Sequence, residues 1–266
     1  MNFRIAIPSS GRSELLLNKT IKYLKMTNID FKNVDIFLSK ADELNDYTDK
    51  LKEYPVNIIV ANNDSINAQR NFMVRYYDVG QCVIGIDDDI NSIESKINDK
   101  KTFTLIDLVE LGEHAFSLCK KYKLNLWGIN SSFNPFFMKN NISFNLKFIA
   151  GGFYGWINSK DDKSFVLEER YHLKEDYERT IKYYRDDGGV IRYNYLAPNT
   201  KVYADKGGIQ DYRTPKSEKK GVDYMLETYP MFCKINNSRK SKFAQIRLFD
   251  QRKKSSKRGK VICSEE

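Results

Sequence analysis

Short apolar runs alternate with helix-like segments in the first third of the chain, and this alternation constrains the fold most. Four β-branched runs are typical of buried strands: residues 3–8, 34–39, 56–61 and 82–86. Helix-like segments lie between them, at residues 13–25, 41–54 and 65–77. Strands and helices that alternate in this way form a mostly parallel sheet with helices on its faces. The sequence therefore predicts an α/β fold with a Rossmann-like sheet.

The predicted helices differ in how clearly one face is apolar. In the segment 65–77, Ala68, Phe72 and Tyr76 recur at four-residue spacing and predict the buried face. A helix of about twenty residues is expected at 103–122. Strand-like runs follow it, and they predict a smaller antiparallel part beside the main sheet.

A further helix is predicted at 174–189, where Tyr177, Ile181 and Tyr184 share one face and Gly188 ends the pattern. Strand-like residues come next, and the chain becomes strongly basic after about residue 235. No repeat or Pro/Ser-rich linker divides it. We therefore expect one domain at residues 1–235 and a basic extension at 236–266.

The chain is basic, with 44 Lys and Arg against 35 Asp and Glu and a net charge of +9 over 266 residues. Such a charge favours an anionic partner such as nucleic acid, nucleotide or a membrane surface. The chain is also rich in Lys, Asn, Ile and Tyr, as an AT-rich genome would produce. Compositional drift is therefore the alternative explanation for part of this charge.

The cysteines and the apolar runs bear on the cellular compartment. Cys82, Cys119, Cys233 and Cys263 are far apart and form no CxxC pair, which excludes a zinc ribbon and disfavours a disulfide framework. The first residues are too polar for a signal peptide, and no apolar run approaches membrane-spanning length. We expect a cytoplasmic protein without membrane insertion, located in the host cytoplasm if its origin is viral.

Three consecutive carboxylates, Asp87, Asp88 and Asp89, directly follow the apolar run 82–86. Like charges repel, and each costs desolvation energy in a cleft. Mg²⁺ or Mn²⁺ removes that cost, because these ions prefer oxygen ligands and share them with phosphate groups. A solvated turn is the alternative. We predict a metal site with Asp87 and Asp89 as ligands, and nucleotide contacts from Asp87 and Asp88.

A short polar loop with Pro8, Ser9, Ser10 and Arg12 follows the first strand. Ligands of open parallel sheets bind beyond the carboxyl ends of the strands, where this loop and the aspartates both lie. Backbone amides and Arg12 are predicted to contact a nucleotide. Ordinary tight loops have a similar composition, so the loop alone is weak evidence.

The pair Arg70–Asn71 on a helix, then a glycine, an apolar strand and three aspartates, resembles the pattern of GT-A glycosyltransferases. The polar loop at 7–12 resembles their first nucleotide-binding loop, and the resemblance covers residues 3–195. It implies a GT-A fold, a UDP-sugar donor, and Mn²⁺ or Mg²⁺ between the aspartates and the diphosphate. It also implies that Arg70 and Asn71 contact the nucleotide.

The segments 151–159 and 174–192 are similar to those of inverting members of these enzymes, which implies that Asp176 is the general base. The helix dipole favours an ionised carboxylate at a helix start, so Asp176 is expected to accept a proton near neutral pH. Acids are also common at ordinary helix starts. Trp156 and Glu175 are predicted to contact the sugar or the acceptor, although Trp156 could equally be core.

Gly207, Gly208 and Gln210 resemble a late element of the TET-associated glycosyltransferases, which are related to the base J glucosyltransferase. This implies transfer of a sugar, glucose foremost, to 5-hydroxymethylpyrimidines such as 5-hydroxymethylcytosine in DNA, by a viral or phage protein. An ordinary turn would look similar. Neither His114 nor His172 has metal-ligand spacing, so the third metal ligand and the oligomeric state stay open.

Three alternatives remain. A GT-A enzyme could act on a glycan, lipid or protein acceptor, because the same fold serves all of them. A sugar-phosphate nucleotidyltransferase should carry a Gly-rich GxGTR-like loop after its first strand, which residues 7–12 lack. A non-catalytic nucleic-acid-binding protein would explain the charge but not three aspartates at one strand end.

Overall fold

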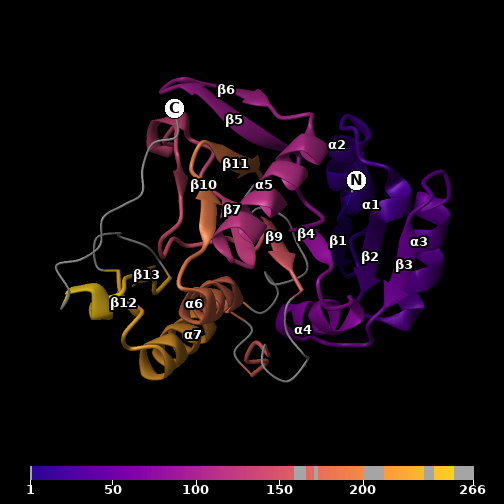
Figure 1. The fold of residues 1–266 in the computed structure, drawn as a ribbon. Coiled ribbons are helices and arrows are strands. Elements are labelled where there is room, and N and C mark those ends of the chain that lie inside the picture. The colour runs from indigo at the N-terminus through magenta and orange to yellow at the C-terminus, as the bar shows by residue number, and fades with distance from the viewer. Residues whose placement is uncertain (1, 159–165, 171–172, 201–212, 237–242, 255–266) are drawn as a thin grey trace.

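A twisted central sheet organises the molecule in the computed structural model, which describes residues 2–158, 166–170, 173–200, 213–236 and 243–254 (Figure 1). Within these residues the sheet has eight strands in the order β3-β2-β1-β4-β9-β7-β10-β8. Their bounds are β1 Arg4–Ser9, β2 Val34–Leu38, β3 Asn57–Val60, β4 Cys82–Ile86, β7 Leu126–Ile129, β8 Ile142–Ser143, β9 Phe153–Ile157 and β10 Ile191–Tyr193. The four strands predicted in the first third of the chain are confirmed to within a residue or two.

The strand directions decide which loops meet. Strands β3, β2, β1 and β4 are parallel, β9 is antiparallel to both β4 and β7, and β10 is parallel to β7. The ends of β1, β4, β7 and β10 therefore lie at one edge, together with the start of β9. The mostly parallel sheet predicted from the sequence is confirmed.

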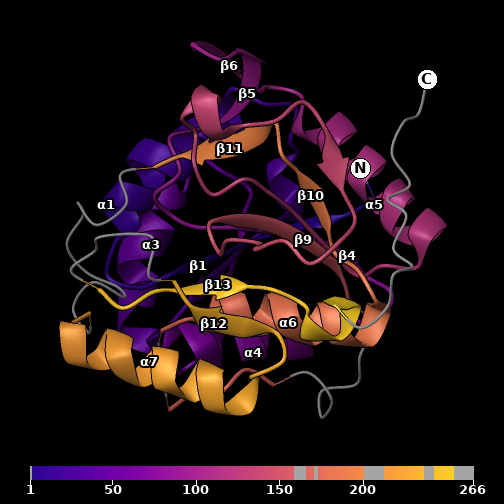
Figure 2. The same cartoon turned by 90° about the vertical axis from the view of Figure 1, so that its left-hand side faces the viewer.

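Successive residues of each strand point to opposite faces of the sheet, so alternate residues belong to two cores, one on each face. Ile5, Ile7 and Ile84 face the helices α1 Ser13–Leu16, α2 Lys22–Lys25, α3 Leu44–Leu51 and α5 Leu108–Tyr122. Ala6 and Val83 face α4 Ile66–Tyr76, α6 Glu175–Asp187 and α7 Pro215–Thr228 (Figure 2). A π-helical turn, Leu17–Ile21, joins α1 to α2.

A three-stranded antiparallel sheet, in the order β11-β5-β6, forms the smaller part predicted from the sequence. Its strands are β5 Ser92–Asn98, β6 Lys101–Thr104 and β11 Leu196–Asn199. The start of the helix predicted at 103–122 was placed too early. Residues 101–104 pair with β5, and the helix begins only at Leu108, where the Asp107 carboxylate accepts a hydrogen bond from the Glu110 amide at 2.9 Å.

Helix α4 buries a different face from the one predicted. Tyr76 is 48% exposed, and Ala68 and Phe72 are only half-buried. The buried side chains are mostly polar: Asn67, Gln69, Arg70, Asn71 and Met73. They remain inside because each polar one finds a partner; the Gln69 carbonyl oxygen, for example, accepts a hydrogen bond from Ser39 Oγ at 2.7 Å.

The prediction for α6 holds, because Ile181 and Tyr184 are buried and Gly188 ends the helix in the left-handed conformation, with φ +82°. The hairpin formed by β12 Cys233–Ile235 and β13 Ile246–Leu248 crosses the expected boundary at residue 235. It packs on α6, where Tyr184 donates a hydrogen bond to Asp250 at 2.6 Å. Described residues on both sides of position 235 thus pack on the same core, and the boundary expected there stays a prediction.

The described helices and cysteines can be compared with the expectations about membrane insertion and disulfide bonds. None of these helices has the length and apolar content needed to span a bilayer. Cys82, Cys119 and Cys233 are buried free thiols. Cys263 and the end of the basic run at 252–260 lie outside the described residues.

Candidate active site

The loop after β1 is tied to the middle aspartate. Asp88 is fully buried, accepts a hydrogen bond from Ser9 Oγ at 2.6 Å and forms a two-point ion pair with Arg12. Burial raises the pKa of Asp88 to about 7, and the Arg12 charge opposes that rise. Asp88 therefore holds the loop against β4. Asp88 and Arg12 contact each other in the structure, and the nucleotide contacts expected from them stay predictions.

Residues at the start of α3 fix the other side of this loop. Glu43 accepts hydrogen bonds from Ser10 Oγ and from the Gly11 amide, both at 2.9 Å. Gly11 has φ +61°, a conformation that favours glycine. Pro8 is buried within β1, opposite Phe37. These contacts hold the loop in one conformation at the sheet edge, and Pro8, Ser9 and Ser10 contribute to that conformation.

The outer two aspartates remain accessible. The Asp87 side chain is 33% exposed and forms an ion pair with Arg70 at 3.2 Å. Asp89 is half-buried, and its carboxylate has no hydrogen bond or ion pair within the described part of the chain. Burial raises the pKa of Asp87 to about 6, because the charges of Asp89 and Glu175 add to the desolvation that Arg70 opposes.

These two carboxylates fit a hard divalent cation. A cation between them would relieve the repulsion that raises the pKa of Asp87 and would give Asp89 the partner it lacks. Among the described residues no group of three His, Cys, Asp or Glu side chains could hold a metal. Asp87 and Asp89 would therefore leave coordination positions for water and substrate phosphate oxygens, which is how Mg²⁺ is usually bound.

Arg70 is the central buried cation of the site. Its guanidinium contacts Asp87, Glu175 Oε1 at 3.1 Å and the Tyr154 hydroxyl at 3.0 Å, and the side chain is 5% exposed. It therefore connects the end of β4, strand β9 and the first turn of α6. Arg70 and the buried Glu175 were expected to face nucleotide and acceptor. In the structure they contact each other and position neighbouring groups, and the expected ligand contacts stay predictions.

Gly151 leaves the space that this arrangement needs. A β-carbon at Gly151 would lie 2.7 Å from Arg70 Nη2 and 3.1 Å from Glu175 Oε1. Arg179 covers the same aromatic ring as Arg70, with its guanidinium carbon 3.6 Å from the centre of the Tyr154 ring. Sequence reasoning considered Tyr154 only as a side chain that packs on a sugar or base or belongs to the core, and it did not identify Arg179.

Asn71 holds a segment of chain, and the nucleotide contact expected of it from the sequence stays a prediction. Its side chain donates hydrogen bonds to the Leu167 carbonyl at 3.0 Å and to Glu169 at 2.8 Å. It also accepts one from the Leu167 amide at 2.8 Å. With 2% exposure and these three bonds, Asn71 fastens residues 166–170 to α4.

Asp176 is the second residue of α6 and is half-buried. Its carboxylate accepts a hydrogen bond from the Tyr177 amide at 2.9 Å. Burial raises the pKa of Asp176 to about 7, and the charge of Glu175 adds to this rise while Arg179 opposes it. The expectation that the helix dipole keeps Asp176 ionised was therefore incomplete, because desolvation outweighs it. A pKa near the working pH suits a general base.

The remaining predicted residues lie elsewhere. Trp156 is 2% exposed and stacks on Tyr154 at 5.4 Å, so it belongs to the core, the alternative that the sequence left open. His114 contacts the Tyr193 hydroxyl at 2.8 Å. The other four predicted or considered residues, Gly207, Gly208, Gln210 and His172, lie outside the described residues.

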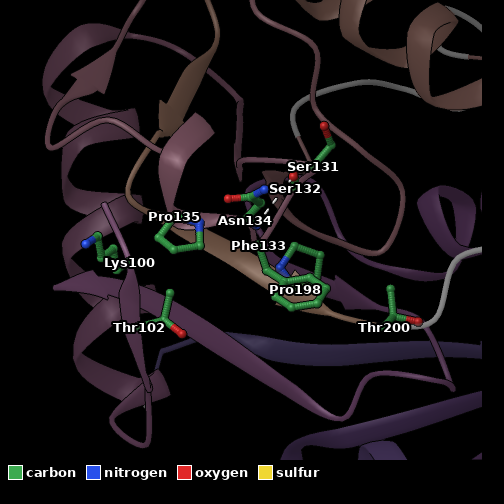
Figure 3. A pocket seen from close by; sticks show the side chains of 9 residues that line it. All are labelled: Lys100, Thr102, Ser131, Ser132, Phe133, Asn134, Pro135, Pro198 and Thr200. Carbon is green, nitrogen blue, oxygen red and sulfur yellow. Dashed lines mark hydrogen bonds between the residues drawn. The ribbon is translucent and has the colours of Figure 1, made fainter. Parts of the chain in front are cut away.

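A separate cavity of about 540 Å³ opens between the β5–β6 hairpin and the loop after β7 (Figure 3). Its lining residues are Lys100, Thr102, Ser131, Ser132, Phe133, Asn134, Pro135, Pro198 and Thr200. Because β7 is parallel to β4, this cavity lies at the same sheet edge as the aspartates. These described lining residues include no carboxylate, so none of them supplies a metal ligand of that kind or a carboxylate general base.

Solved structures of glycosyltransferases share this architecture. S. aureus TarS 1–349 in complex with UDP-GlcNAc has 12% identity and a TM-score of 0.58, covering 85% of this chain and 67% of that one. Glucosyl-3-phosphoglycerate synthase from Mycobacterium tuberculosis, with Mn²⁺ and UDP-glucose, has 7% identity and a TM-score of 0.56, covering 94% and 86%. Mannosyltransferase PcManGT from Pyrobaculum calidifontis, with GDP-Man and Mn²⁺, has 9% identity and a TM-score of 0.53, covering 84% and 64%.

These likenesses show that the chain has the GT-A glycosyltransferase fold. The chain spans 40% of the length of the longer TarS structure and 66% of its 1–349 fragment. Neither a protein-family model nor a curated protein sequence matches this one.

Proposed function

We propose that this protein is a metal-dependent inverting glycosyltransferase that moves a sugar from a UDP-sugar to a hydroxyl group. One observation carries the proposal: Arg70 contacts Asp87 on one side and Glu175, the neighbour of Asp176, on the other. This contact brings a pair of accessible carboxylates and a carboxyl with a near-neutral pKa to the same sheet edge. The nucleotide sugars and Mn²⁺ in the structures of similar fold support the proposal.

Each group has a distinct role in this reaction. Mn²⁺ or Mg²⁺ held by Asp87 and Asp89 would neutralise the diphosphate and make UDP a better leaving group. Asp176 accepts the proton of the acceptor hydroxyl as that oxygen attacks the anomeric carbon. A single displacement from the face opposite the leaving group inverts the configuration. Arg70 holds Asp87 and the start of α6 at a fixed separation throughout.

The acceptor expected from the sequence is a 5-hydroxymethylpyrimidine in DNA. The net charge of +9 supports an anionic acceptor. The resemblance to TET-associated enzymes depends on Gly207, Gly208 and Gln210, which lie outside the described residues. Glycan, lipid and protein acceptors are the alternatives. Three buried free cysteines fit the reducing cytoplasm in which we place the protein.

Calorimetry with UDP-glucose, with and without Mn²⁺, tests the donor half of the proposal. We expect binding that depends on the metal in the wild type and is lost in Asp89→Ala. Asp78→Ala is the control. It removes the same charge from an exposed position just after the C-terminal end of α4 and should bind UDP-glucose normally. Metal-independent binding, or full binding by Asp89→Ala, would overturn the donor assignment.

Product analysis tests the transfer itself. The enzyme is incubated with radiolabelled UDP-sugars and with DNA that contains 5-hydroxymethylcytosine, and in parallel with glycan acceptors. NMR of the product gives the anomeric configuration. Retention of the donor configuration would exclude the role given to Asp176, whichever acceptor is used.

A further inference from the structure

Three cations, Lys139, Lys147 and Arg192, gather at the β10 side of the sheet without an acidic partner; we call them the basic cluster. Arg192 donates hydrogen bonds to neutral oxygens only, Asn194 Oδ1 at 2.7 Å and the Phe148 carbonyl at 3.3 Å. The Lys139 amide donates to the Asn194 carbonyl at 3.1 Å, which places Lys139 beside Arg192. No carboxylate of the described residues forms an ion pair with any of the three.

The electrostatics of the basic cluster indicate a missing anion. Burial lowers the pKa of Lys147, and the charges of Arg192 and Lys139 lower it further. Burial alone lowers the pKa of Arg192. Lys147 and Arg192 are half-buried, whereas Lys139 is exposed. Cations that are partly withdrawn from water are normally paired, because an uncompensated buried charge is costly. The cluster therefore gains stability whenever an anion binds to it.

The basic cluster lies beside the proposed general base. Lys147 precedes Phe148, whose ring stacks on Tyr177 with centroids 4.1 Å apart and planes 24° apart. The next residue, Ile149, is bonded through its amide to Thr180 Oγ1 at 3.2 Å. The chain from 147 to 149 thus runs along the first turns of α6, and Asp176 immediately precedes Tyr177.

The donor diphosphate is not the anion in question. Strand β10 is separated from β4 by β9 and β7, and three spacings of about 4.8 Å amount to roughly 14 Å. Arg192 therefore lies three strands away from the strand that ends in the metal-binding aspartates. On this separation we assign the anion of the cluster to the other substrate, and the donor titration described below tests that assignment.

We propose that the basic cluster binds a phosphate group on the acceptor and so directs a nearby hydroxyl of that acceptor toward Asp176. This proposal rests on the glycosyltransferase function proposed above and adds the acceptor class. Arg192 contacts the carbonyl of Phe148, the residue after Lys147, and the Phe148 ring stacks on Tyr177. This arrangement suits a single phosphate of a small hydroxylated molecule better than a nucleic-acid backbone, which is tracked by an extended positive groove.

Titration of the protein with inorganic phosphate, followed by ³¹P NMR in metal-free EDTA buffer, tests the subsite. We expect saturable binding that weakens at least tenfold in Lys147→Gln and in Arg192→Gln. Lys25→Gln removes the same charge from an exposed position on α2 and should bind phosphate like the wild type. Lys147 is only half-buried, so we expect Lys147→Gln to fold. The test can therefore be made with this variant even if Arg192→Gln unfolds. Equal phosphate binding by all four proteins would overturn the proposal.

Competition identifies the source of the phosphate. Displacement of inorganic phosphate by glycerol 3-phosphate, with glycerol inactive, supports a small phosphorylated acceptor. Displacement by a single-stranded oligonucleotide, with the same dependence on Lys147, would overturn that assignment in favour of a DNA backbone. UDP-glucose with Mn²⁺ is titrated into the same variants and should bind them equally. If the wild type does not bind UDP-glucose in the presence of Mn²⁺, the proposed function is contradicted, whereas the result of the phosphate titration still holds.

Discussion

Replacing Gly151 by alanine should disturb the central ion pairs without touching a catalytic side chain. The new methyl group would lie 2.7 Å from Arg70 Nη2, closer than real β-carbon contacts. Arg70 cannot rotate away freely, because Asp87, Glu175 and Tyr154 hold its guanidinium on three sides. The guanidinium must therefore shift by roughly 0.5 Å, with overpacking of about 1–3 kcal/mol and one weakened charge-assisted bond.

The expected loss of stability is about 2–4 kcal/mol. For a domain of this size that lowers Tm by roughly 5–10 °C. Because Asp87 and the start of α6 move with Arg70, we also expect turnover of UDP-sugar to fall by roughly 10- to 100-fold. Differential scanning fluorimetry and an assay of released UDP measure the two effects.

Gly152→Ala is the matched control. A β-carbon at Gly152 would lie 3.7 Å from Asp87 Oδ2 and from Ile90 Cδ1, which is ordinary contact. Both substitutions stiffen the unfolded chain equally, by about 0.4–1 kcal/mol, so that effect cancels between them. Similar Tm values for the two variants would refute the role given to Arg70.

Four further variants separate the roles of the carboxylates. Asp176→Asn should keep UDP-sugar affinity but lower turnover by roughly 10²–10⁴, the span of a lost general base, as calorimetry and product formation will show. Because only the ionised base accepts a proton and the pKa of Asp176 is raised to about 7, wild-type turnover should rise with pH through about 7. Glu175→Gln removes a charge that raises this pKa, so the acidic limb of its pH–rate profile should move to lower pH; an unmoved limb would contradict the pairing. Asp88→Asn leaves Arg12 without its ion-pair partner and should cost about 3 kcal/mol in urea unfolding, whereas Asp89→Ala should leave stability unchanged and abolish metal-dependent donor binding.

The strands and helices that pattern reasoning located are those with a clear apolar period. Strands β1, β2 and β4 are apolar on both faces because helices cover both sides of the sheet, and such runs are easily recognised. The C-terminal hairpin and β6 were missed because their residues mix Lys, Thr and Arg with single apolar side chains. Helix α7 was missed although Thr214 and Pro215 give a clear N-terminal signal.

The site was only partly predictable, for a different reason. The sequence singled out Asp87, Asp89 and Asp176 as candidates, because carboxylates at a strand end and a helix start have a local signature, and their roles stay predictions. It could not show that Asp88 binds Arg12, because these residues are 76 positions apart and their pairing depends on the fold. Residues that hold other residues in place look the same in sequence as residues that hold a ligand, and Arg70 and Asn71 illustrate this.

The hairpin of β12 and β13 has a consequence for the order in which the chain folds during synthesis. Helix α6 carries Asp176, and its Tyr184 and Ile181 lie in the core that Cys233 and Ile246 complete. A ribosome adds about 5–20 residues per second, so roughly 3–12 s pass between the synthesis of Tyr184 and that of Ile246. During that interval part of an apolar helix face is exposed to the cell. The nascent chain should therefore be most prone to misassembly, and most in need of chaperone protection, just before β13 emerges.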